Sequence, residues 1–221
     1  MKRITAALAA LLLAASLASC GEKETKEPEF GWGNLAGGVY TNEFFGLSIE
    51  MSPDYHYLTP QEIVNKNMEA NSADEDFVPT DINTIEDLGS EAYVEYVYGV
   101  KYKEGEEPGG FNPSIKIYSE NLKVLGTQLS KEDYVRNYLD FSEMIFEGGG
   151  VGVDVYQLEK PWISERQFAK GTMKIQYENY AMQQSMYAIV KGDYVLVFMI
   201  EYITDSERAE LESYVEGLQI D

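Results

Sequence analysis

The two residue types most used for nucleophilic and metal chemistry are almost missing from this chain. Its 221 residues contain one histidine, His56, and one cysteine, Cys20. A Ser-His-Asp or Cys-His arrangement would need His56 as its base, but no Gly-x-Ser-x-Gly sequence accompanies it. Zinc sites would lack their usual imidazole and thiolate ligands. We therefore expect His56 to be a surface or turn residue, and we assign no catalytic residue, metal ligand or cofactor.

Carboxylates are plentiful, and their densest group lies in a polar segment at 72–90. The group consists of Asp74-Glu75-Asp76, Asp81-Ile82-Asn83 and Glu86-Asp87. Calcium prefers such oxygen ligands, but the glycine and the glutamate that an EF-hand needs at its sixth and twelfth loop positions are absent. Calcium binding here stays an alternative. A hydrolase that uses two carboxylates is a second alternative, although spacing selects no particular pair.

A glycine cluster at 148–152 superficially resembles a phosphate-binding loop. It follows a predicted helix and precedes a predicted strand, whereas dinucleotide and Walker sites require the order strand, loop, helix. The last glycine of the dinucleotide pattern and the Walker lysine are also missing. The cluster therefore indicates a helix end followed by a turn.

Tyrosine is the abundant residue with potential for recognition. Tyr96, Tyr98 and Tyr102 alternate along a predicted strand and should share one face, and further tyrosines on later strands are Tyr177, Tyr180 and Tyr187. Because tyrosine combines contact area with a polar tip, the first three form a candidate binding surface. The neighbouring acidic segment at 72–90 would add a loop that prefers a cationic or polar partner. The alternative is that the rings fill the interface between sheet and helices.

The position of Cys20 indicates where the protein is located. Lys2 and Arg3 precede an apolar stretch at 4–17, as in a secretory signal. The run Leu17-Ala18-Ser19-Cys20 resembles the lipobox of bacterial prolipoproteins. That resemblance implies removal of residues 1–19 and attachment of a diacylglyceryl group to Cys20. The alternatives are an ordinary signal cut near Ala18 and an uncleaved transmembrane helix, for which the apolar stretch is shorter than the ~20 residues required.

The charge of the chain excludes some partners. Lys2 and Arg3 belong to the signal, so the mature chain keeps 15 of the 17 basic residues and all 38 acidic ones, a formal charge of −23. Phosphate backbones repel such a surface, so nucleic-acid binding is excluded. Membrane attachment must come from the lipid on Cys20, whose two acyl chains suffice for stable anchoring. With Cys20 modified, no thiol remains for a disulfide.

The chain divides into the signal at 1–19, a flexible tether at 20–38 and a single domain at 39–221. The tether is charged first and rich in glycine afterwards. It also contains Phe30 and Trp32, which are unusual in a linker and either pack on the domain or stay loose.

Strands and helices of the domain follow from alternation and capping. Strands are expected at 39–44, 46–51, 92–102, around Ile115 and Ile117, and at 151–155, 172–190, 194–203 and 218–220. Capping sequences begin helices at Pro60, running to about Asn71, after Ser130, ending at Gly148, and near Thr204 or Asp205. Tight turns join the strands, so the sequence predicts an α+β fold with a largely antiparallel sheet and flanking helices.

Two stretches carry a family resemblance. The opening at 39–53 and the closing at 186–202 resemble the ends of the PsbP-like domain found in small lipoproteins of Gram-positive bacteria. The resemblance covers about 39–60 and 170–221, and it implies an antiparallel sheet between helices. The matching residues are turn formers and core strands, so no catalytic position is transferred.

These observations favour a non-catalytic binding or interaction module that is held by lipid on the outer face of the cell membrane. Its partners would be the membrane, through Cys20, and an unidentified protein or small-molecule ligand. The alternatives are the hydrolase and a structural protein of the cell envelope.

Overall fold

The computed structural model describes residues 28–71, 88–103, 105–155 and 158–221. The predicted signal, Cys20 and the acidic cluster at 74–87 lie outside the described residues. Among the helices in the described ranges, none is both long and apolar enough to cross a membrane.

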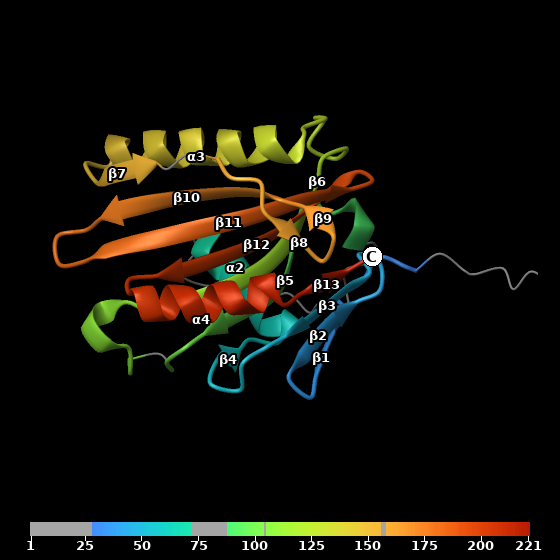
Figure 1. The fold of residues 1–221 in the computed structure, drawn as a ribbon, viewed down its shortest axis with the longest axis horizontal. Helices are drawn as coiled ribbons and strands as arrows, with labels where there is room; N and C mark the ends of the chain where they lie inside the picture. Colours follow the sequence, from blue (N-terminus) through green and yellow to red (C-terminus); the bar gives the residue numbers. More distant parts are fainter. Residues whose placement is uncertain (1–27, 72–87, 104, 156–157) are drawn as a thin grey trace, which may run out of the picture.

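A seven-stranded antiparallel sheet forms the centre of the molecule (Figure 1). Its strands, in spatial order, are β4 (His56–Tyr57), β5 (Tyr93–Val100), β6 (Ser114–Asn121), β12 (Tyr194–Tyr202), β11 (Ala181–Lys191), β10 (Ala169–Gln176) and β7 (Gly152–Val155). β5 and β6 are neighbours, as the predicted hairpin requires.

Two smaller sheets complete the β structure. One is four-stranded, with the order β1 (Asn34–Ala36), β2 (Val39–Asn42), β3 (Leu47–Glu50) and β13 (Gln219–Ile220). The other is the hairpin of β8 (Trp162–Ile163) and β9 (Arg166–Gln167). Because β13 pairs with β3, the two ends of the domain lie in one sheet.

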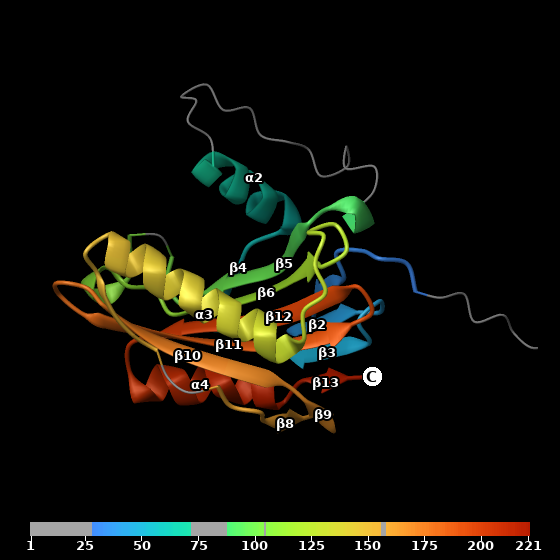
Figure 2. The same cartoon turned by 90° about the horizontal axis from the view of Figure 1, so that it is seen from above.

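Helices cover both faces of the large sheet. They are α2 (Pro60–Asn71), α3 (Lys131–Gly148) and α4 (Asp205–Glu216), with short 3₁₀ helices η2 (Leu88–Ser90) and η3 (Pro108–Gly110). α3 packs on β10, β11 and β7, while α4 packs on β12 and α2 packs on β5. Figures 1 and 2 show α3 and α4 on opposite sides of the sheet. The α+β class and the antiparallel sheet predicted from the sequence are confirmed.

Alternation along β12 explains why the molecule has two cores. Leu196 and Phe198 point to the core that contains α4 and the small sheet. Val195 and Val197 point to the core that contains α3. Successive side chains of a strand face opposite ways, so a central strand covered on both faces is apolar throughout.

The three predicted helix starts are confirmed by their caps. The Ser130 side chain accepts a hydrogen bond from the Asp133 amide, at 3.1 Å. Thr204 and Glu207 form a complete capping box, and the Thr59 amide donates to a Glu62 carboxylate oxygen at 2.7 Å. These bonds satisfy amides that have no partner inside the helix.

The single strand expected over 172–190 is wrong. The chain instead forms β10 and β11, which pair with each other, and the Tyr177 amide donates to the Tyr180 carbonyl at 2.9 Å across the turn. The turn contains Asn179, a residue type typical of turns. Because apolar residues alternate on both sides of this turn, the sequence pattern does not reveal the turn.

Candidate functional site

The described part of the expected tether is packed on the domain. The Phe30 ring stacks on Tyr194 with centroids 4.7 Å apart, and it meets the edge of Phe44 at 4.9 Å. The Tyr40 hydroxyl donates to the Trp32 carbonyl at 2.9 Å, and β1 then pairs with β2. Residues 28–38, which the sequence places in a tether, are thus held by aromatic contacts and strand pairing, in line with the alternative that Phe30 and Trp32 pack on the domain.

Several segments meet where this N-terminal part joins the domain. They are the β6–α3 loop (122–130), the β11–β12 turn (192–193), the β8–β9 hairpin (Trp162–Gln167) and Asp221 at the end of the chain. The Leu122 amide donates to the Asp193 carbonyl at 2.8 Å, and the Ile220 amide donates to Ser164 Oγ at 3.0 Å. Figures 1 and 2 both show these segments at the end where the described chain begins. We call this region the tether end.

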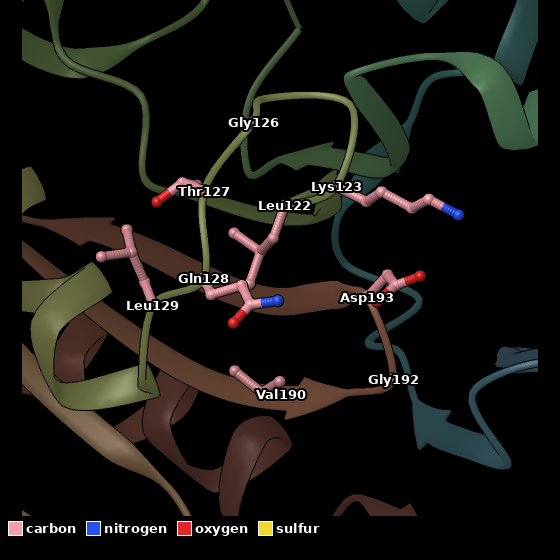
Figure 3. Close-up of a pocket in the computed structure, with 9 residues that line it drawn as sticks. All are labelled: Leu122, Lys123, Gly126, Thr127, Gln128, Leu129, Val190, Gly192 and Asp193. Carbon is pink, nitrogen blue, oxygen red and sulfur yellow. The ribbon is translucent and has the colours of Figure 1, made fainter.

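The tether end contains a pocket of about 720 Å³ (Figure 3). Its lining residues come from the β6–α3 loop and the β11–β12 turn, and they are Leu122, Lys123, Gly126, Thr127, Gln128, Leu129, Val190, Gly192 and Asp193. The loop is shaped by Asn121, whose side-chain oxygen accepts hydrogen bonds from the amides of Lys123 and Val124, at 3.1 and 3.2 Å. The volume is in the range of small-molecule sites.

The pocket lining offers binding groups of three kinds. Leu122, Leu129 and Val190 supply apolar surface, and Thr127 and Gln128 supply a hydroxyl and an amide. Lys123 and Asp193 add one charge of each sign. The pocket lining contains no histidine, cysteine or serine. The arrangement suits a neutral or zwitterionic polar molecule.

Two smaller hollows continue the pocket along the tether end. The first of them has a volume of about 400 Å³ and shares Leu129 and Val190 with the pocket. The other has a volume of about 150 Å³ and shares Arg166 and Val190 with the hollow of 400 Å³. Cations line this groove, namely Lys123, Lys131, Arg166 and Lys191. Within the described ranges, none of the four forms an ion pair, whereas Glu132 of the groove pairs with Lys160 at 3.2 Å.

The expectation that Tyr96, Tyr98 and Tyr102 share one strand face is wrong. A β-bulge between Glu95 and Val97 makes Tyr96 an extra residue and shifts the register of β5. Tyr96 is 3% exposed in the core, where its hydroxyl bonds to Ser119 Oγ at 2.7 Å, and Tyr102 lies beyond the end of β5. A bulge changes the face on which every later residue lies, and alternation in a sequence does not reveal it.

Tyr98 lies on the other face of β5, between two lysines. The Lys66 ammonium is 4.0 Å and the Lys116 ammonium 5.0 Å from the centre of its ring, which are cation–π distances. Burial alone would lower the pKa of Lys116, but the charges of Glu201, Tyr98 and Glu95 together outweigh it and raise that pKa.

The carboxylates on this face are held by neighbours. Glu201 accepts hydrogen bonds from Ser114 Oγ at 2.6 Å and from Gln184 Nε2 at 2.8 Å. Glu95, which is 7% exposed, accepts one from the Tyr93 hydroxyl at 2.7 Å. Both carboxylates thus hold polar side chains of the sheet in place.

The later tyrosines contribute mainly to packing. Tyr187 is 2% exposed, and its hydroxyl donates to Glu212 at 3.1 Å. The rings of Tyr177 and Tyr180 lie 5.1 Å apart, and Tyr180 contacts Phe111. Tyr96 and Tyr187 therefore follow the alternative given by the sequence, in which the rings fill the interface between sheet and helices.

His56 and the glycine cluster lie as the sequence predicts. His56 is exposed on β4, opposite Val100. Gly148 ends α3, the Gly149 amide donates to the Ile145 carbonyl, and Gly150 has a φ of 78° in the turn before β7. Among the described side chains, no three from histidine, cysteine, aspartate and glutamate gather at one place where a metal ion would bind.

The sequence analysis missed the pocket-forming loop. A local signal was present, since Val124 and Leu125 are apolar residues next to Gly126 in a segment with no strand or helix pattern. Half-exposed apolar residues in a loop suggest contact with a partner. The far wall of the pocket comes from residues about 65 positions later in the chain, and no local pattern links the two.

The fold and the pocket define an α+β protein with a candidate small-molecule site. No protein family matches the sequence, and no curated protein is a detectable relative. Among solved structures, the chain is similar to cyanobacterial PsbP (CyanoP) from Synechocystis sp. PCC 6803, with a TM-score of 0.47 and 9% identity over 92% of this chain and 98% of that one.

The chain is also similar to LpqN, which is involved in cell envelope biogenesis of Mycobacterium tuberculosis. Here the TM-score is 0.36 and the identity 11%, over 79% of this chain and 82% of that one. A PsbP protein is thus among the solved structures similar to this chain. At such identities the likeness concerns the arrangement of elements alone and assigns no ligand.

Proposed function

We propose that this protein is a non-catalytic binding module held by a lipid on the outer face of the cell membrane, with its ligand in the tether-end pocket. The pocket lining carries this proposal. It combines apolar walls with a hydroxyl, an amide and one charged group of each sign, the mixture that is typical of small-molecule sites. Anchoring is supported by the run from Leu17 to Cys20 and by the N-terminal signal pattern.

Anchoring is tested by metabolic labelling of the full-length protein with radioactive palmitate. We expect label in the wild-type protein and none in Cys20→Ala, which should leave the membrane fraction or accumulate as precursor. Mass spectrometry of membrane-bound protein that shows a free thiol at Cys20 would contradict the proposal.

Ligand binding is tested by screening the mature protein by NMR against neutral and zwitterionic sugars, amino acids and small peptides. We expect amide shifts at 122–129 and 190–193, and we expect Gln128→Ala to weaken the response about tenfold, the effect of losing one good hydrogen bond to a ligand. Lys174→Ala, on β10, is the matched control. A ligand whose shifts avoid the pocket would contradict this assignment.

The hydrolase alternative receives less support from the described residues. Glu201 and Glu95 each accept hydrogen bonds from neighbouring side chains, and Lys116 lies on the same sheet face. These bonds give both carboxylates a role in holding the side chains of the sheet, and they assign neither of them to catalysis. If a hydrolytic activity is found that Glu201→Gln or Glu95→Gln abolishes in a folded protein, the alternative is correct.

A further inference from the structure

Three large apolar side chains are exposed at the tether end. Trp162 on the β8–β9 hairpin is 70% exposed, and Val124 and Leu125 at the tip of the β6–α3 loop are 49% and 48% exposed. They belong to two separate segments that both border the groove described above. Exposed apolar groups that act together at one end of a domain can contact a membrane or a partner.

The length of chain between Cys20 and the domain limits where this end can be. From Cys20 to Pro28 the chain spans at most about 28 Å, at about 3.5 Å per residue. A domain of this size is about 40 Å across. If Cys20 carries the lipid, as the proposed function requires, the described chain begins within 28 Å of the membrane surface. The tether end is therefore within reach of the lipid surface.

We propose that the tether end rests on the lipid bilayer, with Trp162, Val124 and Leu125 inserted at the level of the headgroups. Tryptophan favours this region because its ring is apolar and its indole N–H is polar. Lys123 and Arg166, which have no ion-pair partner among the described residues, lie beside the inserted groups and can approach lipid phosphates.

The tether end carries charges of both signs, so we expect its contact with the bilayer to depend more on apolar insertion than on anionic lipid. Glu165 and Asp193 lie at the same end as Lys123 and Arg166, and the mature protein is strongly acidic. These acidic groups and the net charge of the protein offset the attraction of the four groove cations for anionic lipid. We expect similar contact with purely zwitterionic vesicles and with vesicles that contain anionic lipid.

A second exposed apolar patch provides a matched control. On the outer side of α3, Phe141, Met144 and Ile145 are 60%, 59% and 54% exposed. The patch is surrounded on the helix by Asp140, Glu143 and Glu147, which would lose hydration on approaching lipid. α3 also carries it away from the tether end, as Figure 1 shows. The α3 patch therefore also exposes three apolar side chains, but at a position that we expect to lie away from the membrane.

The experiment measures the depth of Trp162 in vesicles that carry the lipidated full-length mature protein. The protein contains two tryptophans, Trp32 and Trp162, so the difference between wild type and Trp162→Phe isolates the emission of Trp162. With phosphatidylcholine brominated near the headgroup, we expect this emission to fall about twofold, as for an interfacial indole. Val124→Ser with Leu125→Ser should reduce the quenching, and Phe141→Ser with Met144→Ser should leave it unchanged.

The outcomes separate this inference from the proposed function. Mass spectrometry first establishes whether Cys20 carries the lipid, and an unmodified thiol would contradict the anchoring itself. If the lipidated protein floats with the vesicles while Trp162 is not quenched, the anchor is retained and the contact face is wrong. If the Phe141 and Met144 substitutions abolish quenching instead, α3 lies on the membrane and the inference is overturned.

Discussion

Gly171 of β10 lies directly beneath Val135 of α3, with no room for a side chain between them. A Cβ at position 171 would be 2.5 Å from Val135 Cγ1 and 2.7 Å from Leu139 Cδ1. The absence of this one carbon lets α3 approach the sheet closely, and Val135 is fully buried in the core beneath the helix. The position of α3 in turn places the start of the helix, and the loop before it, beside the pocket.

Replacing Gly171 by alanine should therefore destabilise the domain. The new methyl group forces α3 or its side chains to shift, which costs about 1–3 kcal/mol in a well-packed core. Urea unfolding followed by circular dichroism measures the change. Gly152→Ala on β7 is the control, because its Cβ would be 3.6 Å from the nearest atom, an ordinary contact. Equal stability of the two variants would show that α3 does not depend on this approach.

Tyr55 and Tyr57 should respond in opposite directions to loss of their hydroxyl groups. The Tyr55 hydroxyl is buried without a hydrogen-bond partner among the described residues, whereas the Tyr57 hydroxyl donates to the Ser52 carbonyl at 3.0 Å. Tyr55→Phe should stabilise the fold by up to about 1 kcal/mol, because no bond is lost and a buried polar group is removed. Tyr57→Phe should destabilise it by about 1 kcal/mol. Destabilisation by Tyr55→Phe would indicate a bound water or partner at that hydroxyl.

Phe30 should contribute to the stability of the domain although it precedes the first strand. Phe30→Ala removes the stack on Tyr194 and the edge contact with Phe44, at an expected cost of about 2 kcal/mol for a partly buried ring. Leu35→Ala, at a side chain 39% exposed, should cost much less. Thermal melts of the mature protein make the comparison. A Phe30 variant that melts with the wild type would mean that residues 28–38 are held loosely in solution.

Alkaline pH should unfold the protein through its tyrosines. Burial raises the pKa of Tyr138 to about 12, and it also raises the pKa of Tyr96, Tyr118 and Tyr187. An unfolded tyrosine ionises near pH 10, so the unfolded state releases protons first and gains stability relative to the folded state. Stability is thus intact below pH 10 and falls as the pH rises through 10 towards 12.

Absorbance at 295 nm and circular dichroism, recorded together over this range, test the expectation. The tyrosines whose pKa is raised by burial should ionise only together with the loss of structure. Ionisation of nearly all tyrosines near pH 10 in a protein that stays folded would contradict the burial described here.

Much of the local structure was predictable because its causes are local. Ser130 with Asp133 and Thr204 with Glu207 lie three residues apart and cap helices by bonds within one turn. The starts of α2, α3 and α4 and the end of α3 at Gly148 therefore follow from the sequence. The same holds for β13, which follows directly after α4, and for the turn formed by Gly148 to Gly150.

The candidate site was predictable only in part. The sequence did not predict the contact of Tyr98 with Lys66, and the bulge after Glu95 separates Tyr98 from Tyr96. The pocket was not predicted, because Leu129 and Val190 approach each other only when β11 and the β6–α3 loop are in place. Such contacts depend on strand order and register, which no single segment specifies.

The sequence by itself determined the α+β class, the capped helices, the strong negative charge and the scarcity of residues for nucleophilic or zinc chemistry. These features depend on residue type and on spacings of two to four positions. Only the tertiary structure decided the order of the seven strands, the bulge in β5, the packing of Phe30 on Tyr194 and the groove at the tether end. Each of these joins residues far apart in the chain, where the gain from burial exists only after the intervening chain has folded.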